Sequence, residues 1–79
     1  MPTTKPWILM SAPTCHLCDD AAELLQQAGV AFIKQDITLD AALMRRFALR
    51  IPVLQAPTGT ELSWPFEVAA VQALMESIA

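Results

Sequence analysis

The two cysteines of this chain, Cys15 and Cys18, are three residues apart and enclose His16 and Leu17. This spacing suits a redox-active dithiol, half of a metal site, a structural disulfide or a chance pair. In a reducing cytoplasm a stable structural disulfide is disfavoured, and a close cysteine pair there is more often catalytic or metal-binding. The secondary structure expected around the pair must therefore indicate which of these four alternatives applies.

The composition predicts one small folded domain. The chain has 79 residues, of which 54% are hydrophobic and 16% are charged, and its net charge is −3. This length fits a single core, and this hydrophobicity excludes a disordered chain. We therefore expect one domain over residues 1–79. The five basic residues form no stripe that could follow a phosphate backbone, which excludes nucleic acid as a partner.

The N-terminal segment has only a short apolar run, residues 7–10. The core of a signal peptide needs about 7–15 apolar residues, and a membrane-spanning helix needs about 20. We therefore expect a soluble, cytoplasmic protein without a membrane partner, acting as a monomer.

Apolar periodicity and turn residues predict the order β-α-β-α-β-β-α. The expected elements are a strand at 7–10, a helix from Cys15 to the residue before Gly29, a strand at 30–37, a helix capped by Thr38 or Asp40, an extended segment at 50–54, a turn at 57–60, a strand at 61–64 and a helix from Pro65. The first β-α-β unit requires a right-handed crossover and a parallel strand pair, and the turn favours an antiparallel hairpin. The fold class is therefore α/β, with helices packed on a sheet.

The position of Cys15, where a strand has ended and a helix begins, favours redox chemistry. Unpaired backbone N–H groups and the helix dipole stabilise negative charge there, so we expect the pKa of Cys15 below the value of about 8.5 for a free thiol. Cys18 lies one turn further along the same face, within reach of a disulfide. Cys15 would attack a disulfide of a partner, and Cys18 would resolve the mixed disulfide. A protonated His16 would stabilise the thiolate.

Three features together resemble the thioredoxin fold, and within it the small bacterial glutaredoxin-like proteins. They are the motif Cys15-His16-Leu17-Cys18, the segment Arg50-Ile51-Pro52-Val53 and the order of elements. The resemblance implies a four-stranded mixed sheet with helices on both faces and a thiol–disulfide oxidoreductase. It also implies that Pro52 is a cis-proline beside Cys15 and that Ile51 and Pro52 shape the substrate groove. The partners would be a disulfide-containing protein or small molecule and an unidentified reductant.

The chain departs from the usual glutaredoxin pattern where that pattern binds glutathione. Ala12 stands where a lysine or arginine is usual, His16 and Leu17 replace proline and tyrosine, and Arg50 replaces a threonine. Residues 63–66 lack the usual Gly-Gly-Asp. These departures argue against tight binding of glutathione, and we expect no tightly bound cofactor.

Two other interpretations of the cysteine pair stay open. Zinc needs four ligands, and the motif offers only Cys15, Cys18 and His16, so a metal or cluster site would need a dimer. The second interpretation is a non-catalytic thioredoxin-fold adaptor with inert cysteines. We assign no metal ligands, and we expect Leu17 to be exposed for docking a partner and Arg45 and Arg46 to lie on a solvated helix face.

Overall fold

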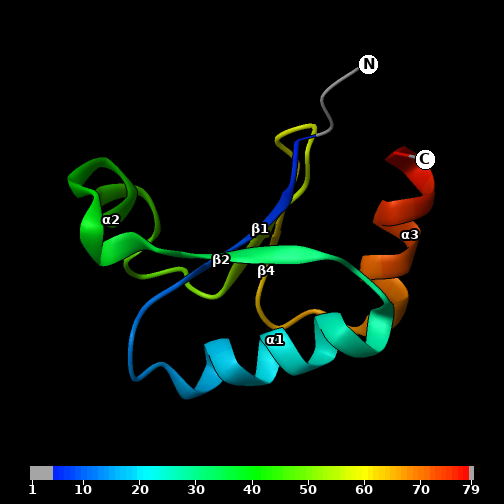
Figure 1. Ribbon diagram of the computed structural model, residues 1–79, viewed down its shortest axis with the longest axis horizontal. Helices are drawn as coiled ribbons and strands as arrows, with labels where there is room; N and C mark the ends of the chain where they lie inside the picture. The colour runs from blue at the N-terminus through cyan, green and yellow to red at the C-terminus, as the bar shows by residue number, and fades with distance from the viewer. Residues whose placement is uncertain (1–4, 79) are drawn as a thin grey trace.

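The computed structural model describes residues 5–78 of the chain, shown in Figure 1. The elements are β1 (Trp7–Ser11), α1 (His16–Ala28), β2 (Phe32–Asp36), the short 3-10 helix η1 (Ile37–Leu39), α2 (Ala41–Phe47), β3 (Val53–Gln55), β4 (Glu61–Ser63) and α3 (Val68–Ile78). The predicted order of strands and α-helices is confirmed.

The four strands form one mixed sheet in the order β2-β1-β3-β4. β1 and β2 are parallel, as a β-α-β unit requires, and Ser11 lies opposite Asp36. β3 runs antiparallel to β1, with Val53 opposite Met10, and β4 runs antiparallel to β3. The carboxyl end of β1 therefore lies at the same end of the sheet as the start of β3.

Helices cover both faces of the sheet, as expected. On one face α1 and α3 pack against the sheet around Leu9, Leu25, Leu54 and Val71. On the other face lies a smaller cluster, which is formed by Met10, Ile37, Phe47 and Val53. Because strand side chains alternate between faces, Leu9 and Met10 belong to different clusters although they are neighbours in β1.

Both ends of α1 follow from local chemistry. Cys15 is the N-cap residue, and Gly29 ends the helix in a left-handed conformation with φ of 82°. The N–H of Gly29 donates to carbonyl groups of the last turn, as in the usual glycine-terminated helix. The predicted limits of this helix are therefore confirmed.

The last helix begins later than predicted, at Val68 rather than Pro65. Residues 64–66 instead follow a non-helical path in which the rings of Trp64 and Phe66 meet edge to face, with centroids 5.1 Å apart. Both rings contribute to the α1–α3 side of the core. Covering this core outweighs the preference of proline for the first turn of a helix.

Candidate redox site

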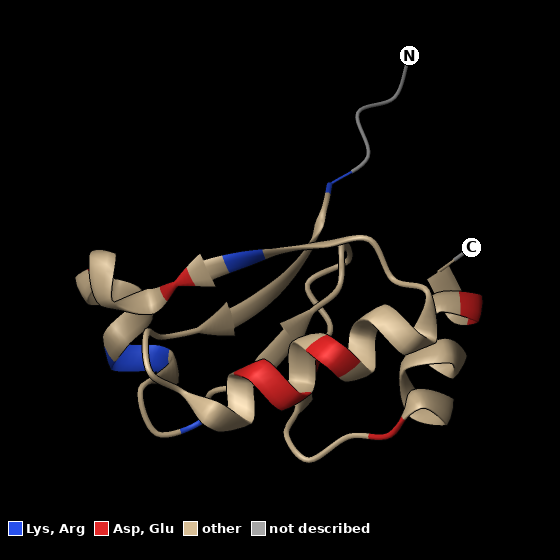
Figure 2. Cartoon of the chain, turned by 60° about the horizontal axis from the view of Figure 1, so that its bottom comes forward, with Lys and Arg blue, Asp and Glu red and all other residues tan. Residues whose placement is uncertain are grey.

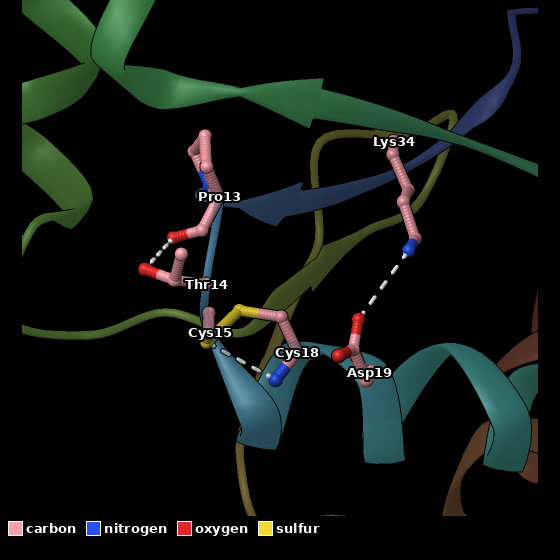
Figure 3. Close-up of a disulfide and its surroundings, with 6 residues drawn as sticks. All are labelled: Pro13, Thr14, Cys15, Cys18, Asp19 and Lys34. Atoms are coloured by element: carbon pink, nitrogen blue, oxygen red, sulfur yellow. Dashed lines mark hydrogen bonds and ion pairs between the residues drawn. A yellow bond between two sulfur atoms is a disulfide. The ribbon is translucent and has the colours of Figure 1, made fainter.

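The two cysteines lie at the start of α1 and are joined in a disulfide (Figure 3). Their Cα atoms are 5.2 Å apart, and the backbone N–H of Cys18 donates to Sγ of Cys15 over 3.1 Å. Cys15 adopts an extended conformation, as N-cap residues do, and its sulfur takes the place of the usual capping oxygen. The first turn of the helix therefore directs a backbone donor at the sulfur of Cys15.

The two cysteine residues differ in their exposure. Cys18 is 1% exposed, whereas Cys15 is partly exposed at the end of the helix. His16 and Leu17, which lie between them, are both exposed. Only Cys15 is therefore placed to meet a partner, and the predicted exposure of Leu17 is present.

A tight turn connects β1 to the cysteines. Thr14 has a φ of 61°, in the left-handed region that residues other than glycine seldom adopt. Its hydroxyl donates to the carbonyl oxygen of Pro13 over 2.6 Å, as Figure 3 shows. This backbone conformation costs free energy, and such conformations cluster at functional sites. Here the turn brings the chain from the end of β1 to the N-cap of α1.

Two prolines lie at the same end of the sheet as this turn. The Ile51–Pro52 peptide bond is cis, and Pro52 directly precedes the β3 residue that pairs with Met10 of β1. The Trp64–Pro65 bond is also cis. The N–H of Trp64 donates to the carbonyl oxygen of Pro52 over 3.2 Å, which links the two segments. The sequence singles out Ile51 and Pro52 for the site, whereas it predicts Pro65 only as the start of the last helix.

A hollow of about 280 Å³ lies beside the buried cysteine. Its walls come from the turn before α1, from the helix itself and from β2, and consist of Ser11, Ala12, Pro13, Thr14, Cys18, Asp19, Lys34 and Asp36. At its rim Nζ of Lys34 lies 3.8 Å from Oδ1 of Asp19 (Figure 3). This ion pair joins β2 to the residue that follows Cys18.

A second ionic cluster holds α2 to β4. Glu61 accepts a hydrogen bond from Arg46 through one carboxylate oxygen and from Arg50, over 2.8 Å, through the other. Both guanidinium groups also lie over the ring of Phe47, 4.9 and 5.2 Å from its centroid. Arg46 is exposed, as expected, but it also pairs with Glu61, which the strand pairing brings within its reach.

Within residues 5–78, no three His, Cys, Asp or Glu side chains are grouped so that they could hold a metal ion. In the same part of the chain, none of the helices is both long and apolar enough to cross a membrane.

This fold and site define a class, the thioredoxin-like fold with a CxxC pair at the start of its first helix. Residues 7–76 match the family described as Glutaredoxin-like domain (DUF836), and the chain belongs to this family. The X-ray structure of the structural genomics target protein XcR50 from X. campestris is 43% identical, with a TM-score of 0.83, and the match covers 90% of this chain and 96% of that one.

A more distant structure shows the fold alone. A mutant form of the thioredoxin-like protein BC3987 is 23% identical with a TM-score of 0.67, over 91% of this chain and 96% of that chain. Among curated proteins, no relative matches this sequence. The resemblance to glutaredoxin-like proteins that the motifs predicted is confirmed, and so is the α/β fold class.

Proposed function

We propose that this protein is a glutaredoxin-like thiol–disulfide oxidoreductase that reduces disulfides through Cys15 and Cys18. The main support for this proposal is that Cys15 caps α1 at a partly exposed position, with the N–H of Cys18 directed at its sulfur. A backbone donor and the helix dipole both stabilise a thiolate, so we expect the pKa of Cys15 below that of a free thiol. Burial of Cys18 favours its neutral form.

The reaction balances as two thiol–disulfide exchanges. The thiolate of Cys15 attacks one sulfur of the substrate disulfide, forms a mixed disulfide and releases the first substrate thiolate. Cys18 then loses its proton and attacks Sγ of Cys15, which forms the Cys15–Cys18 disulfide and releases the second substrate thiolate. Two electrons pass from the protein to the substrate, and the two thiol protons pass to the released thiolates.

The proposal includes a cytoplasmic location, where a thiol or dithiol reductant returns the protein to its dithiol form. It also assigns Ile51 and Pro52 to the groove that receives the substrate, because they precede β3 at the end of the sheet where the loop to Cys15 begins. Glutathione is not required as the reductant.

Cysteine variants test the proposal. With a dithiol reductant and a protein disulfide as substrate, C15S should abolish turnover, because no thiolate remains to attack. C18S should accumulate a mixed disulfide on Cys15, detected by intact mass and peptide mapping. Equal turnover by C15S and the wild type would overturn the assignment. Stoichiometric zinc or iron in anaerobically purified protein would point instead to a metal-binding function.

A further inference from the structure

The lysine that lines the hollow beside the buried cysteine is compensated within the chain. Lys34 lines the hollow beside Cys18, and its Nζ lies 3.8 Å from Oδ1 of Asp19. A carboxylate of a ligand in this hollow would have to compete with Asp19 for the same ammonium group. Because Asp19 directly follows Cys18 in α1, this competitor is fixed beside the redox pair.

The cations on the proline side are compensated in the same way. Arg50, two residues before Pro52, and Arg46 each donate to a different oxygen of Glu61. The Glu61 side chain is only 17% exposed, so it is held between the two guanidinium groups rather than free in solvent. Glu61 therefore takes the guanidinium donors that would otherwise hold a carboxylate of a ligand.

The two remaining lysine and arginine side chains lie elsewhere. Lys5 precedes β1 and so lies at the opposite end of that strand from the redox site, and Arg45 is an exposed residue of α2. The outer face of α1 adds negative charge through Asp20 and Glu23, which form no ion pair within residues 5–78, and Figure 2 shows acidic residues along this helix. The lysine and arginine side chains named around the site are therefore all paired with carboxylates, and the exposed His16 is the basic group of the motif itself.

Two exposed leucines lie on the chain segments that lead into the cysteine pair and into Pro52. Leu17, within the motif, is 52% exposed, and Leu49, just before Arg50, is fully exposed. Exposed aliphatic side chains of this size suit contact with another polypeptide.

We infer that the site selects its substrate by charge, and that the substrate is a protein disulfide flanked by apolar or basic side chains rather than glutathione disulfide. This inference rests on the proposed function. It assigns specificity to two carboxylates: Asp19 pairs with Lys34, and Glu61 pairs with Arg46 and Arg50. Each half of glutathione disulfide carries two carboxylates and one ammonium group, so its net charge is repelled by the acidic face of α1.

A series of small disulfides that differ in charge tests this selection. Pre-reduced protein, freed of reductant, is mixed at low ionic strength with cystamine, bis(2-hydroxyethyl) disulfide or 3,3′-dithiodipropionate, which are cationic, neutral and anionic. Each rate is divided by the rate at which dithiothreitol reduces the same disulfide. We expect the anionic disulfide to react about threefold more slowly than the neutral one, and the difference to disappear near 1 M salt.

Matched variants separate ion pairing from overall charge. D19N frees Lys34, whereas D20N removes the same charge from the neighbouring position and frees no cation in the described structure. E61Q frees Arg46 and Arg50, and E67Q is its control at an exposed position. D19N and E61Q should raise the normalised rate with the anionic disulfide about threefold relative to the rate with the neutral one, and both controls should change this ratio less.

The outcomes distinguish the inference from the proposed function. If the protein reduces none of the three disulfides, the proposed function fails. If it reduces all three at equal normalised rates, the function stands and charge selection is overturned. If D20N and E67Q act as strongly as D19N and E61Q, the specificity role of the two paired carboxylates is overturned.

Discussion

The redox site has two parts, the cysteine pair and the Pro52 segment, and different faces of the sheet support them by different contacts. The α1–α3 face carries the cysteines on a 13-residue helix, and the buried residues of its core are Leu9, Ala21, Ala22, Leu25, Ala28, Val30, Leu54, Phe66 and Val71. The α2 face leads through residues 48–51 to Pro52, and its buried core has four members. The cysteine half therefore rests mainly on apolar burial, and the proline half rests on far less of it.

The difference is visible within the helices themselves. α1 buries residues in successive turns, whereas Phe47 is the only buried residue of the seven-residue α2. Polar contacts make up part of the deficit: Asp40 caps α2, and Glu61 ties it to β4 through Arg46 and Arg50. A helix this short is marginal without such support.

The largest effect is expected from F47A. Removing a fully buried aromatic side chain costs about 3–5 kcal/mol of the free energy of unfolding, and the same change also removes the ring beneath both guanidinium groups. L25A removes a fully buried residue of the larger core, which has more members to compensate for the loss. Urea denaturation should show a greater loss for F47A than for L25A. A greater loss of stability for L25A than for F47A would contradict this expected order. F47L provides a milder variant if F47A does not fold.

A smaller effect is expected from D40A. Oδ1 of Asp40 accepts hydrogen bonds from the N–H groups of Ala42 and Leu43, over 2.8 and 3.2 Å. Loss of such a cap costs about 1 kcal/mol. Hydrogen exchange should report faster opening of α2 than of α1 in this variant, while D40N, which retains a capping oxygen, should change little. Equal acceleration in both helices would mean that α2 is not separately held.

The smallest effect on stability is expected from E61Q. Both arginine side chains are more than a third exposed, so solvent screens the ion pairs and the loss should stay below about 1 kcal/mol. The loss, measured by urea denaturation, should shrink further at high salt. R45Q, at a position without an ion pair in the described residues, is the control. A loss that does not depend on salt would show that Glu61 acts through packing or neutral hydrogen bonds instead.

The sequence predicts the features that depend on local chemistry. The apolar period after Cys15, the Gly29 terminus and the Asp40 cap fix the helices, and the first β-α-β unit fixes the parallel strand pair. These signals also place the cysteine pair at a helix start, which is the basis of the proposed chemistry.

The features that sequence reasoning missed depend on contacts between distant residues. Glu61 is 15 residues from Arg46 and 11 from Arg50, and only the hairpin of β3 and β4 brings them together. Lys34 meets Asp19 because the strand register places Lys34 opposite Leu9, on the face of the sheet that α1 covers. The later start of α3 reflects burial of Phe66, which local proline preference does not reveal.

The most direct test of the account is the pH dependence of alkylation at each cysteine of the fully reduced protein. Iodoacetamide rates, assigned to Cys15 and Cys18 by peptide mapping, report the thiolate fraction of each residue. We predict that Cys15 reacts first and that its rate rises with an inflection below about 8.5, the pKa of a free thiol. Equal rates for the two cysteines, with an inflection at or above that value, would contradict the assignment of Cys15 as the nucleophile.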